Sequence, residues 1–138
     1  GLPFKTGLTI CYDLRFPEMF GKLSRDKEDG VGGGHGSEVI LVPSAFMKKT
    51  GEAHWETLLR ARAIENGCFI VAAAQVGRHN GTERESFGNS LIIDPWGKVV
   101  TRMDDFSEGV IHAVIDRELV FSARKSMPCH NHRRPECY

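Results

Sequence analysis

Short apolar runs alternate with helix-like segments over the first half of the chain. Residues 7–11, 38–42 and 68–74 are apolar and partly β-branched, a pattern typical of strands. The third run has no polar alternation, which indicates a strand covered on both faces. Between these runs, Pro17-Glu18 predicts a helix start over 17–23, and apolar residues at helical spacing predict a helix over 54–66 that stops at Asn66-Gly67.

The second half of the chain has the pattern of consecutive strands. Residues 91–93 and 98–100 flank Asp94-Pro95-Trp96-Gly97, whose proline and glycine are typical of a tight turn. A last strand is predicted over 109–116, with Val110, His112 and Val114 on one face. We expect loops at residues 30–36, 44–53 and 77–89, and a basic, proline-containing tail at 117–138. This order predicts an α/β fold, a mixed β-sheet with helices on at least one face.

The composition limits the possible number of domains and the possible classes of protein. The chain has 138 residues, 41% of them hydrophobic, and 18 basic and 18 acidic side chains, which suits one domain with a real core. Zero net charge argues against a nucleic-acid binder with a broad basic face. No apolar run approaches the length of a membrane-spanning helix. Because the chain starts at Gly1 directly before a strand, we expect it to be a piece of a longer, intracellular protein.

The candidate nucleophile is Cys11, at the end of the first predicted strand and shortly before a helix start. A helix N-terminus there favours the thiolate and offers backbone N–H groups to a developing oxyanion. Asp13 and Arg15 are expected to pair and fix the turn. The alternative is a buried structural cysteine beside a surface ion pair, and the spacing alone leaves both open.

Residues 10–18 (ICYDLRFPE) resemble the nucleophile segment of the nitrilase, or carbon–nitrogen hydrolase, superfamily. The resemblance is greatest to its Nit branch, of deaminated glutathione amidase and Nit-Fhit type. It continues in order through six further segments: 43–46 (PSAF), 54–66 (HWETLLRARAIEN), 71–75 (VAAAQ), 86–90 (SFGNS), 94–97 (DPWG) and 132–135 (HRRP). One departure is Gly88-Asn89-Ser90, where the family often has Gly-His-Ser.

The resemblance implies a partial α-β-β-α sandwich in which residues 1–138 form the C-terminal half of the hydrolase domain and 117–138 a packing or dimer contact. It implies a cysteine nucleophile at Cys11 and an oxyanion contact from the backbone N–H of Tyr12. A substrate pocket is implied along four residues, Pro43, Ser44, Ala45 and Phe46. The family triad also has a Glu and a Lys upstream of the cysteine. Lys5 is too close to Cys11 to match that lysine, and no glutamate precedes Cys11.

The activity implied is hydrolysis of a small carboxylate-bearing amide, such as deaminated glutathione, through a thioester. The family implies no cofactor and no metal, a small-molecule amide as partner, no nucleic acid and no membrane. It also implies a homo-oligomer in the full-length form and a cytoplasmic or mitochondrial location. Without the Glu and Lys, we expect residues 1–138 alone to be inactive.

Two hypotheses compete with the enzyme. The first is a non-catalytic fragment or pseudoenzyme that acts as an interaction module. The second is a small zinc-binding module at the C-terminus, although the spacing of its candidate ligands fits no standard site. These ligands are Cys129, His130, His132 and Cys137. Arg60, Arg62 and Glu65 could bind an acidic substrate, but an ion-pair network that packs helix on sheet is the favoured interpretation.

Overall fold

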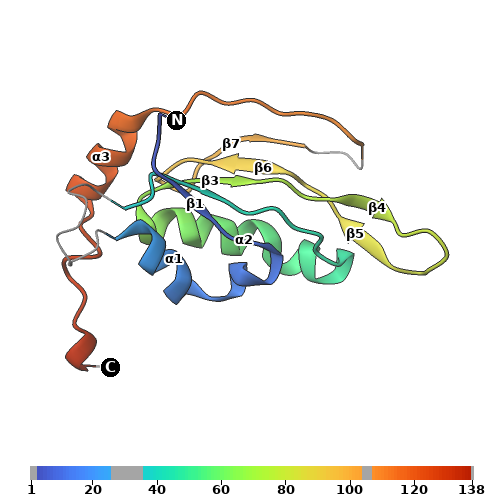
Figure 1. The fold of residues 1–138 in the computed structure, drawn as a ribbon, viewed down its shortest axis with the longest axis horizontal. Coiled ribbons are helices and arrows are strands. Elements are labelled where there is room, and N and C mark those ends of the chain that lie inside the picture. Colours follow the sequence, from blue (N-terminus) through green and yellow to red (C-terminus); the bar gives the residue numbers. More distant parts are fainter. Residues whose placement is uncertain (1–2, 26–35, 104–106, 138) are drawn as a thin grey trace.

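The described part of the chain forms a five-stranded sheet, a two-stranded hairpin and three α-helices (Figure 1). The computed structural model describes residues 3–25, 36–103 and 107–137, so the predicted glycine-rich loop lies outside it apart from Gly36. The elements are, in chain order, β1 (Thr6–Leu8), the 3₁₀ helix η1 (Cys11–Arg15), α1 (Pro17–Ser24), β2 (Val39–Leu41), α2 (Lys48–Asn66), β3 (Phe69–Ala72), β4 (Val76–Arg78), β5 (Glu85–Phe87), β6 (Leu91–Ile93), β7 (Val99–Arg102), α3 (Arg117–Ser126) and the 3₁₀ helix η2 (Pro135–Cys137).

Parallel and antiparallel pairing meet within the larger sheet, whose strand order is β1-β2-β3-β6-β7. β1, β2 and β3 are parallel, because α1 and α2 serve as the crossovers that parallel strands need. β6 and β7 are antiparallel and are joined at the predicted Asp94–Gly97 turn. The mixed α/β sheet is therefore confirmed, and the carboxyl ends of β1 and β2 share one edge, where Cys11 and Pro43 follow.

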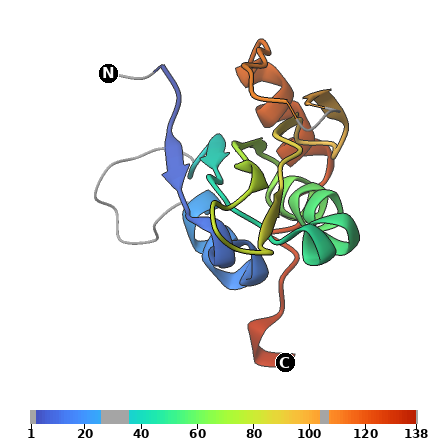
Figure 2. The ribbon, with the colours of Figure 1, turned by 90° about the vertical axis from the view of Figure 1, so that its right-hand side faces the viewer.

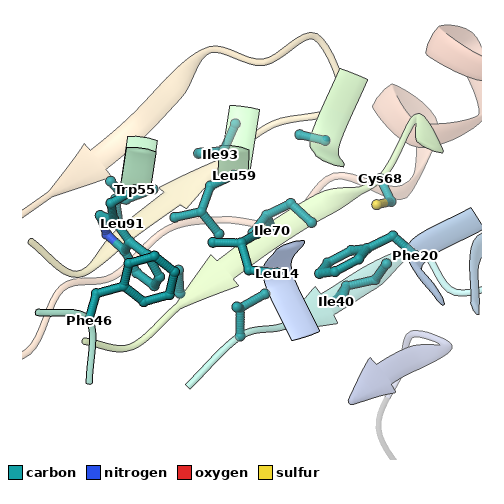
Figure 3. Close-up of a cluster of buried hydrophobic side chains, with 13 residues drawn as sticks. Leu14, Phe20, Ile40, Phe46, Trp55, Leu59, Cys68, Ile70, Leu91 and Ile93 are labelled. Atoms are coloured by element: carbon teal, nitrogen blue, oxygen red, sulfur yellow. The ribbon is translucent and has the colours of Figure 1, made fainter. Parts of the chain in front are cut away.

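Helices α1 and α2 cover one face of this sheet (Figures 1 and 2). Alternate strand residues point to these helices and are buried. Figure 3 shows the resulting core, which contains Leu14 of η1, Phe20 of α1, and Trp55 and Leu59 of α2. The strand residues in this core are Ile40, Val42, Ile70, Ala72, Leu91 and Ile93.

The opposite face is covered mainly at one end, by α3. Val120 of α3 is fully buried against Val39 and Phe69, and Leu41 and Val71 beside them are only half-buried. The Asp116 carboxylate accepts a hydrogen bond from the N–H of Glu118 and so caps α3. The sequence predicted a basic tail here and missed this helix.

Helix α2 begins at Lys48, six residues before the predicted start, so the predicted loop at 44–53 is wrong over most of its length. Gly51 lies inside this helix, where the helix approaches β5 closely. A Cβ at this position would lie 2.3 Å from the Cβ of Phe87 in β5, so only glycine fits between helix and hairpin. The predicted stop is confirmed, because Gly67 caps α2 with φ at 53°.

Two further predictions about the second half are wrong. The loop predicted at 77–89 contains most of β4 and all of β5, which form their own antiparallel hairpin. The strand predicted at 109–116 does not form: this stretch is extended but lies outside both sheets. Its alternating valines do not pack either, since Val114 is 88% exposed.

Candidate active site

Cys11 lies at the sheet edge where the parallel strands end. Two residues separate it from β1, and it is the first residue of η1. Its φ is 46°, in the left-handed region that residues other than glycine rarely adopt. The N–H of Cys11 donates to the carbonyl of Pro43 over 2.8 Å, which ties this bend to the end of β2. A backbone of this kind costs on the order of 1–3 kcal/mol and is typical of functional sites.

A short 3₁₀ turn, rather than an α-helix, follows the candidate nucleophile. The first hydrogen bond of this turn runs from the N–H of Asp13 to the carbonyl of Ile10, at 3.0 Å. The N–H of Tyr12 precedes that bond and is at a position for which the turn supplies no acceptor. Cys11 and Tyr12 are therefore the first two residues of the turn, and the half-buried Cys11 side chain packs beside the main core.

The predicted pair between Asp13 and Arg15 is wrong. The Asp13 carboxylate instead accepts a hydrogen bond from the N–H of Ile10, 2.9 Å away, and closes the start of the turn. A carboxylate satisfies an N–H at a helix start better than it satisfies a partly solvated arginine, since the N–H has no other acceptor. This contact leaves the Arg15 guanidinium available for other groups.

Aromatic rings hold the Arg15 guanidinium. Its Cζ lies 5.4 Å from the ring centroid of Tyr12 and 5.3 Å from that of Phe46, at cation–π distance. Its Nη1 is 3.5 Å from Nδ1 of His54, the one hydrogen-bond contact of this side chain within the described residues. No carboxylate in those residues lies within ion-pair distance of Arg15. The geometry thus places a half-buried cation without an acidic partner four residues after Cys11.

A buried arginine fixes the other end of the turn. Arg62 of α2 donates from Nε and Nη2 to the carbonyl of Leu14, at 3.1 and 2.9 Å. Its Nη1 also pairs with Glu65 at 3.1 Å. Arg60 pairs with Glu56 and donates to the carbonyl of Gly97. These contacts confirm the ion-pair network interpretation of this helix.

The structure brings two of the four predicted pocket residues to the turn. Pro43 accepts from Cys11, and Phe46 packs against Arg15. Ser44 extends the parallel pairing of β2 and β3, where its N–H donates to the carbonyl of Ala73. Among the described residues, no hydrogen bond joins Ser44 or Ala45 to Cys11, although both lie between the two residues that do touch the turn.

A second strained backbone position, at Asn89, is linked to this site through Trp55. This strain was not identified from the sequence. Asn89 has φ at 65° and Gly88 has φ at 70°, so the chain turns sharply between β5 and β6. The indole Nε1 of Trp55 donates to the carbonyl of Asn89 over 2.8 Å, and the Trp55 ring lies 4.9 Å from that of Phe46. A Gly-Asn pair favours left-handed backbone, which was the available signal.

The other cysteines differ sharply from Cys11. Cys68 is fully buried, and burial raises the pKa of its thiol to about 12, opposed in part by the Arg124 charge. Cys129 and Cys137 are exposed. Within the ranges that the structure describes, no three His, Cys, Asp or Glu side chains gather as metal ligands do, so the zinc hypothesis has no ligand set there.

A cavity of about 600 Å³ lies away from Cys11, where α1, α2 and α3 end. There the Ser24 hydroxyl donates to Oδ1 of Asn66 at 2.8 Å and lies 3.2 Å from Nε2 of His130. Burial, and then the charges of Arg25, Arg124 and Arg133, lower the pKa of His130. This contact fastens the C-terminal segment to the helices.

In the ranges that the structure covers, no helix has the length and apolar character needed to cross a membrane.

Known proteins similar to this chain identify its family. The carbon-nitrogen hydrolase family model matches residues 1–125, and the chain belongs to that family. It is 48% identical over 134 residues to the deaminated glutathione amidase of Mus musculus, a match that covers 97% of this chain and 38% of that relative. Two solved structures are also similar. The NitFhit protein of C. elegans has a TM-score of 0.81 and 47% identity, over 96% of this chain and 30% of that one. Saccharomyces cerevisiae Nit3, of the nitrilase superfamily, has a TM-score of 0.77 and 30% identity, over 96% and 44%. The chain thus spans about two fifths of the length of the curated relatives it matches.

Proposed function

We propose that Cys11 is the nucleophile of a carbon–nitrogen hydrolase that cleaves a small amide bearing a carboxylate. The observation that carries the proposal is the strained turn itself. A cysteine with φ at 46° starts η1 at the carboxyl edge of a parallel sheet, four residues before a cation without an acidic partner in the described chain. Membership of the hydrolase family supports the same role.

Family membership supports a reaction in two stages. The Cys11 Sγ attacks the amide carbonyl carbon, and the backbone N–H of Tyr12 donates to the carbonyl oxygen as negative charge develops on it. The C–N bond breaks, the proton that the Cys11 thiol gave to the family glutamate passes to the nitrogen, which leaves as the amine, and the acyl group stays on sulfur as a thioester. Water then attacks the thioester, which releases the carboxylic acid and regenerates the thiol.

Arg15 supplies the preference for a carboxylate-bearing substrate. A guanidinium binds a carboxylate through two parallel N–H donors, and the rings of Tyr12 and Phe46 hold its plane in place. Pro43, Ser44 and Ala45 border the acyl group. Deaminated glutathione is the first substrate to test, because relatives with that substrate in their names are close to half identical to this chain.

The triad is completed from outside residues 1–138, which correspond to the C-terminal half of the domain, with 117–138 as a packing contact. Lys5 cannot supply the family lysine, because it precedes β1 and six extended residues place it roughly 20 Å from Cys11. Glu38 is no substitute base, since it is buried and pairs with Arg117 at 3.0 Å. Each missing group costs on the order of a hundredfold or more in rate.

The test measures amide hydrolysis by the full-length protein and by residues 1–138. We expect turnover of deaminated glutathione by the full-length protein, none by residues 1–138, and at least a thousandfold loss in Cys11→Ser. Cys129→Ser, at an exposed cysteine, is the matched control and keeps full activity. Turnover by Cys11→Ser close to that of the wild type would overturn the nucleophile, whereas turnover by residues 1–138 alone would overturn the requirement for outside groups.

A non-catalytic interaction module is the second candidate, and one observation favours it. Leu8, Ile10, Tyr12 and Phe16 are all about half exposed or more along β1 and the turn, which is an apolar surface suited to a protein partner. Under this alternative the full-length protein shows no thioester on Cys11. Intact-mass measurement after acid quench, with deaminated glutathione as the amide, separates the two.

A further inference from the structure

We infer that the hydrogen bond between Trp55 and Asn89 positions the Arg15 guanidinium for a substrate carboxylate, through the ring of Phe46. The inference deepens the proposed function and rests on its assignment of Arg15. Trp55 and Asn89 are positioning residues in this scheme, because their hydrogen bond and the ring contact of Trp55 lead to Phe46 rather than to Arg15 itself.

The two rings beside Arg15 are not equivalent supports. Tyr12 is 64% exposed, whereas Phe46 is 6% exposed and belongs to the main core. The carbonyl of Phe46 also accepts a hydrogen bond from the N–H of Phe87 in β5, at 2.8 Å. An exposed ring can rotate with its guanidinium, but a buried ring cannot. The direction in which Arg15 presents its donors therefore depends on Phe46.

The orientation of Phe46 depends in turn on Trp55. Their ring centroids are 4.9 Å apart at an interplanar angle of 52°, and Figure 3 shows them side by side at one end of the core. Phe46 lies in no helix or strand, but the hydrogen bond from Phe87 and the bridge between Met47 and Ser86 anchor its backbone, so the direction of its ring is left to side-chain packing. A tilted contact with a large buried ring is the geometry that sets such a side chain.

Trp55 has one polar atom, and the position of its partner is set by strained backbone. The indole is 1% exposed and donates to the carbonyl of Asn89. That carbonyl takes its direction from φ at 65° in Asn89 and 70° in Gly88, where a Cβ would lie 2.7 Å from Val76 Cγ2. Asparagine tolerates this region and β-branched residues do not. The backbone turn at 88–89 thus sets the indole, the indole sets Phe46, and Phe46 sets Arg15.

The test compares how fast Cys11 of the full-length protein reacts with iodoacetate and with iodoacetamide. The two reagents share a leaving group and differ in charge, and the ratio of their rates is normalised to N-acetylcysteine. We expect the wild-type ratio to exceed that of the free thiol several-fold, and Arg15→Gln to abolish the excess. Modification is followed on the Cys11 peptide by mass spectrometry.

Two variants then break the chain of contacts at different points. Trp55→Phe removes the donor but keeps a ring, and Asn89→Val forces the backbone out of the left-handed region. Both are expected to lose most of the excess ratio. Asn89→Gly, which keeps the left-handed backbone, rescues the ratio, and Trp96→Phe at an exposed tryptophan leaves it unchanged. Thermal melts establish which variants are folded, and either folded variant decides the outcome.

The outcomes distinguish a failure of the positioning role from a failure of the carboxylate-binding role of Arg15. If wild type and Arg15→Gln give the same ratio, the carboxylate role of Arg15 is wrong and the inference falls with it. If Arg15→Gln loses the excess but a folded Trp55→Phe or Asn89→Val keeps it, only the inference is overturned. If both variants unfold, the indole contact is structural and the positioning role is rejected. A loss that Asn89→Gly does not rescue also contradicts it.

Discussion

The two faces of the five-stranded sheet differ in how completely the chain covers them. On the helix side, Ile40, Ile70 and Ile93 from three neighbouring strands are all fully buried. On the other side, Leu41 and Val71 are half-buried. Leu8, in register with Leu41 on the edge strand, is 69% exposed. The described residues thus close one face of the sheet and leave much of the other open.

This difference shows where the rigid part of the candidate site originates. The turn at Cys11 is attached to the closed face, because the Leu14 side chain lies in the core and Arg62 of α2 donates hydrogen bonds to the Leu14 carbonyl. The open face carries the same apolar strand pattern without the same burial. Apolar runs therefore predict that a strand will be covered, but not which segment covers it.

The largest expected effect is a difference in reaction rate between the thiols of Cys68 and Cys11. Cys68 belongs to the closed core and Cys11 lies at its edge. With the pKa of Cys68 near 12, only about one molecule in 10⁴ carries its thiolate at pH 8. We expect Cys68 to react with iodoacetamide on the order of a thousandfold more slowly than Cys11. Peptide-level mass spectrometry measures both rates in one sample, and equal rates would contradict the core placement.

Two side-chain truncations, one on each face of the sheet, test how completely each face is buried. Leu59→Ala removes a fully buried side chain from the closed face and is expected to lower the free energy of unfolding by about 3 kcal/mol. Val71→Ala acts on the open face, and the expected loss is under about 1.5 kcal/mol. Denaturant unfolding of the full-length protein gives both values. Equal losses would show that the open face is covered as well.

The attachment of the turn to α2 is tested with two arginines on the same helix. Arg62→Leu leaves the buried Leu14 carbonyl without its donors, which is expected to cost about 2 kcal/mol of unfolding free energy. Arg60→Leu is the control, since Arg60 is largely solvent-exposed, and we expect a loss below about 1 kcal/mol. If Arg60→Leu proves as costly as Arg62→Leu, the turn is held by other contacts.

The smallest effect is expected at His130, which fastens the C-terminal segment at the helix ends. Its pKa in the folded protein lies below the ordinary value near 6.5, so the unfolded chain binds the proton first as pH falls. The stability that neutral His130 contributes is present above about pH 6.5 and is lost on acidification. Hydrogen exchange over 127–137 at pH 7.5 and 5.5 measures this change. His130→Gln, which does not titrate, is expected to flatten it, and an unchanged pH response would contradict the assignment.

Much of the fold was predictable because its elements depend on residues close together in the sequence. The early strand and helix alternation, the Gly67 stop and the Asp94–Gly97 turn all follow from spacing and turn chemistry. The start of α2 was missed because Gly51 has a tertiary cause, the Phe87 ring, that no local pattern contains. The strand predicted at 109–116 failed for a related reason, since alternation alone cannot supply a neighbouring strand.

The sequence predicted a turn after the strand that leads to Cys11, but it did not predict the contacts around that turn. Cys11 and Phe46 were named from the sequence, whereas the role of Arg15 was misjudged because Asp13 is its nearest acid along the chain. In the structure, the nearby N–H of Ile10 takes that carboxylate instead. Competition between a backbone donor and a side-chain cation depends on turn geometry, which single residue types do not specify.

The turn at Cys11 is five residues long, yet distant parts of the chain close it at both ends. Pro43 fixes its first N–H, and Arg62, 48 positions beyond Leu14, fixes its last buried carbonyl. During synthesis on the ribosome, the segment up to Pro43 must emerge before the first restraint can act, and the segment up to Arg62 before both can. A nascent chain therefore carries an ordinary cysteine, and its special geometry arises only once translation has moved well past it.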